Sequence, residues 1–226
     1  MERTLTSGSV FQNILFFSLP YLLSYFLQTL YGMADLLIIG QFEGVAGTTA
    51  VSIGSQVMHM LTVMIVGLAM GTTVSIGHAI GGKRKKDAAA AIGNTVTMFL
   101  LLSVVCTVLL LVCIKPIVAL MSTPEDAVAG TISYLTVCFL GIPFITAYNI
   151  SSIFRGLGDS KRPMYFIAIA CVVNIGLDYL LMGALHMGPI GAALGTTLSQ
   201  AVSVLVALLV IRKQKIGVSV CKADFK

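Results

Sequence analysis

The chain contains few charged residues, and this scarcity excludes most soluble architectures. Asp, Glu, Lys and Arg make up 10% of its 226 residues, whereas a soluble domain carries about 25%. Hydrophobic residues make up 57%, and the mean hydropathy is +0.98. Because so few polar side chains cannot cover a water-facing surface, most of the chain must face lipid or other buried helices. Six apolar helices of about 20 residues each would leave no room for a sizeable soluble domain.

The sequence also lacks the motifs that would indicate an enzyme or a metalloprotein. It contains no Cys-x-x-Cys, no Cys and His at metal-ligand spacing, and no P-loop. No nucleophile and base can be paired from their spacing. Four of the five cysteines lie inside apolar runs and are expected to be buried thiols. We therefore expect no enzyme, no cofactor, no metal beyond a transported ion, and no direct use of ATP.

The net charge of +5 does not indicate a nucleic-acid-binding protein. The basic residues lie in short turns between apolar runs, and no aromatic residues alternate with them to form a stacking platform. The orientation of a membrane protein explains them better. The apolar run near the N-terminus is too long for a signal peptide, so it is expected to remain as the first helix.

Charges, glycines and prolines divide the apolar runs into six predicted transmembrane helices. They are expected over 11–40, 50–80, 88–114, 127–154, 163–185 and 189–211. Residues 1–211 would thus form one all-α membrane domain, followed by a basic tail over 212–226. Pro20 is expected to kink the first helix, and Pro143 with Gly141 the fourth, because proline frees a backbone carbonyl.

Basic residues predict how the domain lies in the membrane. With six helices, 13 of the 14 Lys and Arg fall on one face, and Lys115 alone falls on the other. The 13 are Arg3, Lys83, Arg84, Lys85, Lys86, Arg155, Lys161, Arg162, Arg212, Lys213, Lys215, Lys222 and Lys226. The positive-inside rule makes that face cytoplasmic. We expect a multi-pass protein of the plasma or inner membrane with both termini inside.

Two carboxylates, Asp35 and Asp178, interrupt otherwise apolar helices. A charged side chain at mid-membrane costs about 2.5–3.5 kcal/mol on insertion scales, so such residues are rare and usually face a bundle interior or a watery cavity. They commonly bind or relay an ion. The structural alternative is an Asp that is hydrogen-bonded into a helix contact.

Further polar residues are predicted to lie near the two carboxylates. Asp35, Asp178 and Thr196 all fall about 10 Å below the outer boundary, at 1.5 Å rise per residue. Tyr31 and Asn174 each precede an Asp by four residues, which places them one turn away on the same helix face. If the three helices are adjacent, five oxygen-bearing side chains converge.

Such a cluster suits a hard cation. Carboxylate, amide and hydroxyl oxygens are ligands for Na⁺. The cluster also suits a proton, because two carboxylates close together in a low dielectric favour a state in which one of them is protonated. No Lys or Arg is predicted deep inside a helix, so the interior favours positively charged partners.

Five segments, in order along nearly the whole chain, resemble one family of transporters. They are LPYLLSYFLQTLYGMADLLIIG from Leu19, HAIGGKRKKDA from His78, FRGLGDSKRPM from Phe154, NIGLDYLL from Asn174 and GPIGAALGTTLSQ from Gly188. Together they are similar to the multidrug and toxic compound extrusion (MATE) family, and to its bacterial DinF/NorM-like members in particular.

The resemblance implies an antiporter that exports organic cations and other xenobiotics in exchange for H⁺ or Na⁺. In this family the N-terminal lobe contains a cation site. Carried onto matching positions, that site comprises Asp35, Asn174, Asp178 and Thr196, with Tyr31 nearby. Cation binding and substrate release would alternate, and the Pro20 kink would help to reshape the first helix.

One departure from the family is large. MATE proteins consist of two six-helix lobes with substrate between them, whereas this sequence ends just after its sixth helix. Three interpretations stay open: a fragment or truncated reading frame; a lobe that pairs with a separately encoded half or with a second copy; and a remnant without transport activity. The second predicts a partner lobe, besides membrane lipid and organic cations.

Two other functions stay open. A flippase of the same superfamily would carry lipid-linked saccharides, although the predicted lack of buried cations disfavours it. A non-transporting membrane subunit would not need the carboxylate pair.

Overall fold

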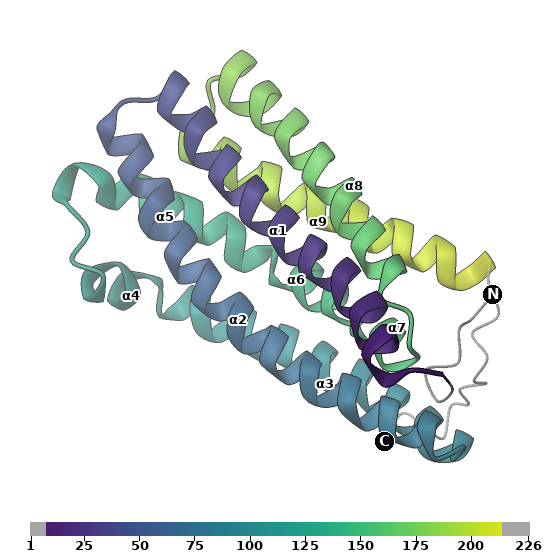
Figure 1. The fold of residues 1–226 in the computed structure, drawn as a ribbon. Coiled ribbons are helices and arrows are strands. Elements are labelled where there is room, and N and C mark those ends of the chain that lie inside the picture. Colours follow the sequence, from purple (N-terminus) through teal and green to yellow (C-terminus); the bar gives the residue numbers. More distant parts are fainter. Residues whose placement is uncertain (1–7, 214–226) are drawn as a thin grey trace.

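The computed structural model describes residues 8–213, which form a bundle of helices without a β-strand (Figure 1). The helices are α1 (Val10–Phe42), α2 (Val45–Gly81), α3 (Lys85–Val112), α4 (Ile114–Leu120), α5 (Glu125–Leu140), α6 (Ile142–Asn149), α7 (Ser152–Gly156), α8 (Lys161–Asp178), the π-helix η1 (Tyr179–Ala184) and α9 (Gly188–Lys213). The all-α fold class predicted from the apolar runs is confirmed.

Five of these segments are each long and apolar enough to cross a membrane: α1, α2, α3, α8 continued by η1, and α9. A sixth segment consists of α5 followed by α6 and α7, with a bend of 46° between its two parts. The bend lies at Gly141, two residues before Pro143. Counted as one span, this bent segment completes the six spanning helices that the sequence predicts.

The first helix passes through Pro20 without a break. One turn later, the Ser24 hydroxyl donates a hydrogen bond to the Pro20 carbonyl oxygen at 2.8 Å. A kink at Pro20 stays a prediction. Of the predicted basic tail, only residues 212 and 213 are described, as the end of α9; Arg3 and residues 214–226 lie outside the described residues.

Successive spans run in opposite directions, so the basic turns gather at one end of the bundle (Figure 1). This basic end carries Lys83 and Arg84 between α2 and α3, Lys85 and Lys86 in the first turn of α3, and Lys161 and Arg162 at the start of α8. The loop before α8 turns at Gly158, whose φ is +89°. Asp159 then caps α8: its Oδ1 accepts the backbone N–H of Lys161 and of Arg162, and its Oδ2 pairs with the Arg162 guanidinium at 2.9 Å.

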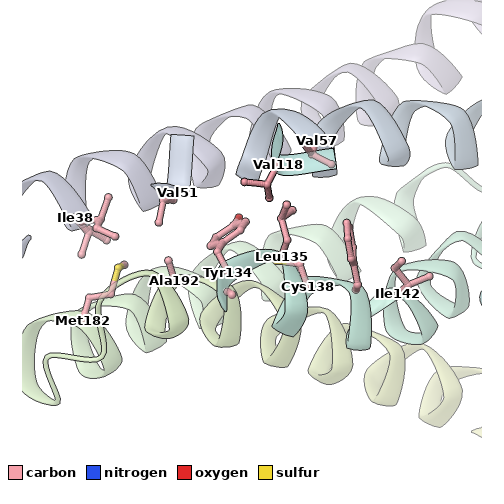
Figure 2. Packing of buried hydrophobic residues seen from close by; sticks show 13 residues of the cluster. Ile38, Val51, Val57, Val118, Tyr134, Leu135, Cys138, Ile142, Met182 and Ala192 are labelled. Carbon is pink, nitrogen blue, oxygen red and sulfur yellow. The ribbon is translucent and has the colours of Figure 1, made fainter. Parts of the chain in front are cut away.

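The main apolar core lies between α1, α2, α5 and α9, toward the end opposite the basic one (Figure 2). Val51 of α2 lies near Ala192 of α9 and Tyr134 of α5, and Ile38 of α1 lies opposite Met182 of η1. Small residues permit this close packing, since a Cβ added at Gly54 would overlap the Tyr134 ring. The core therefore fixes α1 and α9 next to each other at the depth of Asp35.

Candidate cation site

Three helices that are far apart in the sequence bring the predicted residues together. α8 packs against both α1 and α9, and α1 also contacts α9. Asp35 of α1 is 6% exposed, and Asn174 and Asp178 of α8 are fully buried. The π-helix η1 begins directly after Asp178. Such local widening of a helix occurs frequently at functional sites.

Asp35 forms the centre of this carboxylate cluster, which we define as Asp35, Asn174, Asp178 and Thr196. The Thr196 hydroxyl donates a hydrogen bond to Asp35 Oδ2 at 3.1 Å and so links α9 to α1. Asp178 and Asn174 interact electrostatically with the Asp35 carboxyl from the α8 side. The convergence of the three helices expected from residue depth is therefore present in the fold.

Gly195 allows α9 to approach Asp178. A Cβ built at Gly195 would overlap Asp178 Oδ1 and would lie 3.7 Å from Asn174 Nδ2. The carboxylate thus rests against the backbone of α9, at a position that no larger residue could occupy without displacing it. The spacing of Gly191 and Gly195 predicts a close helix contact in this region, but it does not identify Asp178 as the group in contact.

A second polar pair lies one helical turn from the cluster. Gln200 of α9 donates from Nε2 to the Tyr31 hydroxyl of α1 at 3.4 Å. Tyr31 also interacts electrostatically with Asp35, four residues further along α1. Sequence reasoning missed Gln200. The spacing that identified Tyr31 and Asn174 could have found it, because Gln200 follows Thr196 by four residues.

Several polar atoms of this region have no hydrogen-bond partner among the described residues. They are Asp35 Oδ1, both side-chain oxygens of Asp178, both polar side-chain atoms of Asn174, and Gln200 Oε1. Buried polar groups are nearly always satisfied by protein, water or an ion. An oxygen-rich cluster with free lone pairs on two carboxylates and an amide matches the preference of a small hard cation. The same two carboxylates are equally able to share a proton.

The composition of the cluster does not suit a transition metal. Within residues 8–213, no group of three or more His, Cys, Asp or Glu side chains is arranged to hold a metal ion. The described cysteines are free, with Cys138 and Cys171 buried.

Arg155 marks the basic end of the bent segment. It was expected in the turn that follows 127–154, and it is the last residue but one of α7, where the segment ends at Gly156. Its guanidinium carbon lies 5.0 Å from the centre of the Tyr21 ring of α1. This cation therefore lies at the basic end of the bundle and away from the carboxylate cluster, in keeping with the expectation that no Lys or Arg lies deep inside a span. The two predicted kink residues, Pro20 and Pro143, lie outside that cluster as well.

Comparison with known proteins identifies the relatives of this chain. The family model MatE matches residues 20–180. The "Probable multidrug resistance protein YoeA" of Bacillus subtilis is 32% identical over 212 residues, which cover 92% of this chain and 46% of that protein.

Two solved structures have the same fold. A MATE protein in the bent conformation superimposes with a TM-score of 0.91 at 29% identity, over 98% of this chain and 50% of the other. A transporter of the MOP superfamily from Pyrococcus furiosus, described as having a binding pocket of reverse polarity, gives 0.89 at 29% identity, over 98% and 49%.

The chain spans about half the length of the relatives that it matches. The matched range of the family model covers most of the sequence, and the six spans correspond to one half of the related structures. The chain therefore belongs to the multidrug and toxic compound extrusion (MATE) family of membrane transporters, of which it forms one lobe.

Proposed function

We propose that this chain is one lobe of a cation-coupled antiporter that exports organic cations and other xenobiotics across the plasma membrane. The carboxylate cluster would bind the coupling ion, Na⁺ or H⁺, with Asp35 and Asp178 providing charge and Asn174 and Thr196 neutral oxygens. Tyr31, one helical turn before Asp35 on α1, would interact electrostatically with the Asp35 carboxyl. One observation carries the proposal: two buried carboxylates face each other while three of their four oxygens lack a protein partner.

The geometry suggests how ion binding would act on the fold. Without a cation, two buried carboxylates oppose each other across the contact of α1 with α8. A bound Na⁺, or one proton, removes that repulsion and draws α1 toward α8 and α9. Pro20 lies in α1 between Asp35 and the basic end of the bundle. A movement of α1 at Asp35 would therefore be transmitted through Pro20 to the part of α1 at the basic end. A second lobe, as a separate chain or a second copy, would enclose the substrate.

Thermal unfolding of the purified 226-residue chain would test cation binding. The buried thiols of Cys138 and Cys171 become reactive on unfolding, so a thiol-reactive fluorophore reports the transition. Na⁺ would be titrated against N-methyl-D-glucamine at constant ionic strength. A ligand at 100 times its Kd stabilises the folded state by about 2.7 kcal/mol, so we expect the unfolding temperature to rise with Na⁺. Asp35→Asn should abolish the rise, and Asp126→Asn, which changes an exposed carboxylate in the first turn of α5, should keep it.

The same assay at pH 6 and pH 8 separates the two ions. Protons compete with Na⁺ for the carboxylates, so a Na⁺ site gives a smaller Na⁺ effect at pH 6. A proton-only site gives no Na⁺ effect but an unfolding temperature whose pH dependence changes in Asp35→Asn. If neither Na⁺ nor pH acts through Asp35, the proposed coupling site is wrong.

Export itself is tested by ethidium efflux from cells that express these 226 residues. Efflux that is lost in Asp35→Asn would mean that the lobe works as a pair of copies. If the chain inserts into the membrane but gives no efflux, co-expression with a separately encoded second half is the decisive comparison.

One competing function is a non-transporting membrane subunit. That role predicts full function after Asp35→Asn. A flippase of lipid-linked saccharides would be expected to hold cations at its polar centre, and the carboxylate cluster contains no Lys or Arg.

A further inference from the structure

Buried polar atoms without a partner are not scattered through this lobe. Among the described residues, nine such side-chain atoms occur, and only Thr107 Oγ1 lies apart from the others. Six belong to Asp35, Asn174, Asp178 and Gln200, and the remaining two are the Tyr148 hydroxyl and Ser151 Oγ. The unpartnered atoms therefore extend from the carboxylate cluster toward the basic end of the bundle.

Electrostatic interactions and one ring contact link these residues in a line. Tyr31 interacts with Asp35 on one side and with Tyr148 of α6 on the other. The Tyr148 hydroxyl in turn has Ser151 and Arg155 as polar neighbours. Arg155 then lies over the ring of Tyr21 on α1.

This line crosses much of the membrane. Asp35 and Tyr21 are 14 residues apart on α1, which corresponds to about 21 Å of a hydrocarbon core of about 30 Å. One end is formed by α1, α8 and α9, and the other by α1, α6 and α7. The line therefore connects the carboxylate cluster with the end that the positive-inside rule assigns to the cytoplasm.

Elsewhere the lobe satisfies its buried hydroxyls locally. The Thr131 and Thr146 hydroxyls donate to carbonyl oxygens of their own helices, at 2.9 and 3.0 Å. Ser203 donates across to the Phe166 carbonyl at 3.0 Å. With the exception of Thr107, the unpartnered groups of the described residues thus follow one line, and water is the partner that such groups commonly take.

We propose that this line, through Tyr31, Gln200, Tyr148 and Ser151, is a hydrated route by which the coupling cation passes between the carboxylate cluster and the cytoplasm, and that Arg155 closes its inner end. The identity of the ion as cargo rests on the proposed function, whereas the hydration of the route does not. A guanidinium at the exit repels cations and so opposes leakage while the route is closed. Release would require Arg155 to move away from Tyr21.

Hydration can be tested on the unaltered chain by hydroxyl-radical footprinting, in which radicals form from water molecules at the protein. Tyr31 and Tyr148 should be oxidised at least tenfold faster than Phe139, which lies fully buried in the apolar core. Equal protection of Tyr148 and Phe139 would overturn the proposal.

Thiol labelling tests access from the basic side. In inside-out membrane vesicles, with the five natural cysteines changed to Ala, Ser151→Cys is compared with Thr146→Cys. Both positions are buried, at 5% and 2% exposure, but the Thr146 hydroxyl bonds within its own helix. A cationic, membrane-impermeant methanethiosulfonate should label Ser151→Cys at least tenfold faster. Equal rates at the two positions would exclude the route.

The role of Arg155 is tested in the same vesicles. Adding Arg155→Gln to Ser151→Cys should speed labelling several-fold, because the positive charge that repels the reagent is gone, and Arg155→Lys should restore the slow rate. Equal labelling rates in Arg155→Gln and Arg155→Lys would remove Arg155 from the proposal. Neither labelling result depends on ion binding at Asp35, so failure of the route and failure of the coupling site are distinguishable.

Discussion

Two buried polar regions of this lobe differ in how their groups are satisfied. In the α2–α7 contact, formed by Thr72, Thr73, Ser152 and Gly156, every side-chain hydroxyl has a partner. Thr73 donates to the carbonyls of Ala69 and Ser152, and Thr72 lies 3.4 Å from the Ser152 hydroxyl. In the carboxylate cluster, the hydrogen bond from Thr196 is accompanied by five unpartnered atoms.

This difference in hydrogen bonding indicates a structural role for the α2–α7 contact and an ion-binding role for the carboxylate cluster. A satisfied polar contact joins helices and needs nothing further, so its residues are expected to affect stability. An unsatisfied cluster with two carboxylates is costly in the absence of a ligand. Its residues are therefore expected to affect ion binding and to contribute little to stability.

The largest effect is expected from Asp178→Asn. Removing one member of a buried charged pair typically costs about 2–5 kcal/mol of binding free energy, so Na⁺ affinity should fall by about 30-fold or more. Without Na⁺ the unfolding temperature should stay equal or rise, because a repulsion between carboxylates is lost. Both quantities come from the thiol-reactive unfolding assay. A lower unfolding temperature without Na⁺ would mean that Asp178 stabilises the fold, as the residues of the α2–α7 contact are expected to do.

Gly195→Ala sharpens the comparison without changing a polar group. Its methyl group must displace Asp178 Oδ1. Overpacking typically costs about 1–3 kcal/mol, so we expect Na⁺ affinity to fall about tenfold or more. Gly176→Ala on α8, where nothing lies within 4 Å of the added Cβ, is the matched control and should bind normally. Equal Na⁺ affinities in the two variants would show that Asp178 is not held against α9.

Gly156→Ala is the counterpart in the α2–α7 contact. The new Cβ would lie 2.8 Å from Ile76 Cβ and 3.0 Å from the Thr73 carbonyl oxygen. We expect a loss of about 1–3 kcal/mol in the free energy of unfolding, measured by SDS denaturation, with unchanged Na⁺ affinity. Gly71→Ala on α2, with open space around the Cβ, should be neutral or slightly stabilising. A drop in Na⁺ affinity in Gly156→Ala would contradict the separation of the two regions.

Sequence reasoning reached much of this arrangement because helix periodicity and rise convert position into depth and face. Asp35, Asp178 and Thr196 could be assigned a common depth, and Tyr31 and Asn174 a common face, without any knowledge of neighbours. Which helices touch is decided by side-chain packing, such as Ala192 and Met182 in the apolar core, and no single-helix pattern contains that information.

The residues that were missed share a physical reason. The spacing of Gly191 and Gly195 predicts a close helix contact, but only the packing of α8 against α9 makes Asp178 the group that Gly195 contacts. Arg155 was assigned to a turn because basic residues usually end a span. Its contact with the Tyr21 ring joins α7 to α1, and a pattern within one helix does not contain that information.

The smallest and most closely matched effects are expected from two threonines. Thr196→Val removes the hydrogen bond to Asp35, and Thr73→Val removes the one to the Ser152 carbonyl. A hydrogen bond contributes about 0.5–1.5 kcal/mol net. Each variant should therefore lose about 1 kcal/mol, Thr196→Val from the free energy of Na⁺ binding and Thr73→Val from the free energy of unfolding. Thr196→Val should weaken Na⁺ binding about fivefold and leave unfolding nearly unchanged, with Thr196→Ser restoring affinity. Thr73→Val should lower the free energy of unfolding and leave Na⁺ binding unchanged. If both variants lose Na⁺ affinity, or both lose unfolding free energy, then the presence or absence of hydrogen-bond partners does not distinguish structural from functional sites in this lobe.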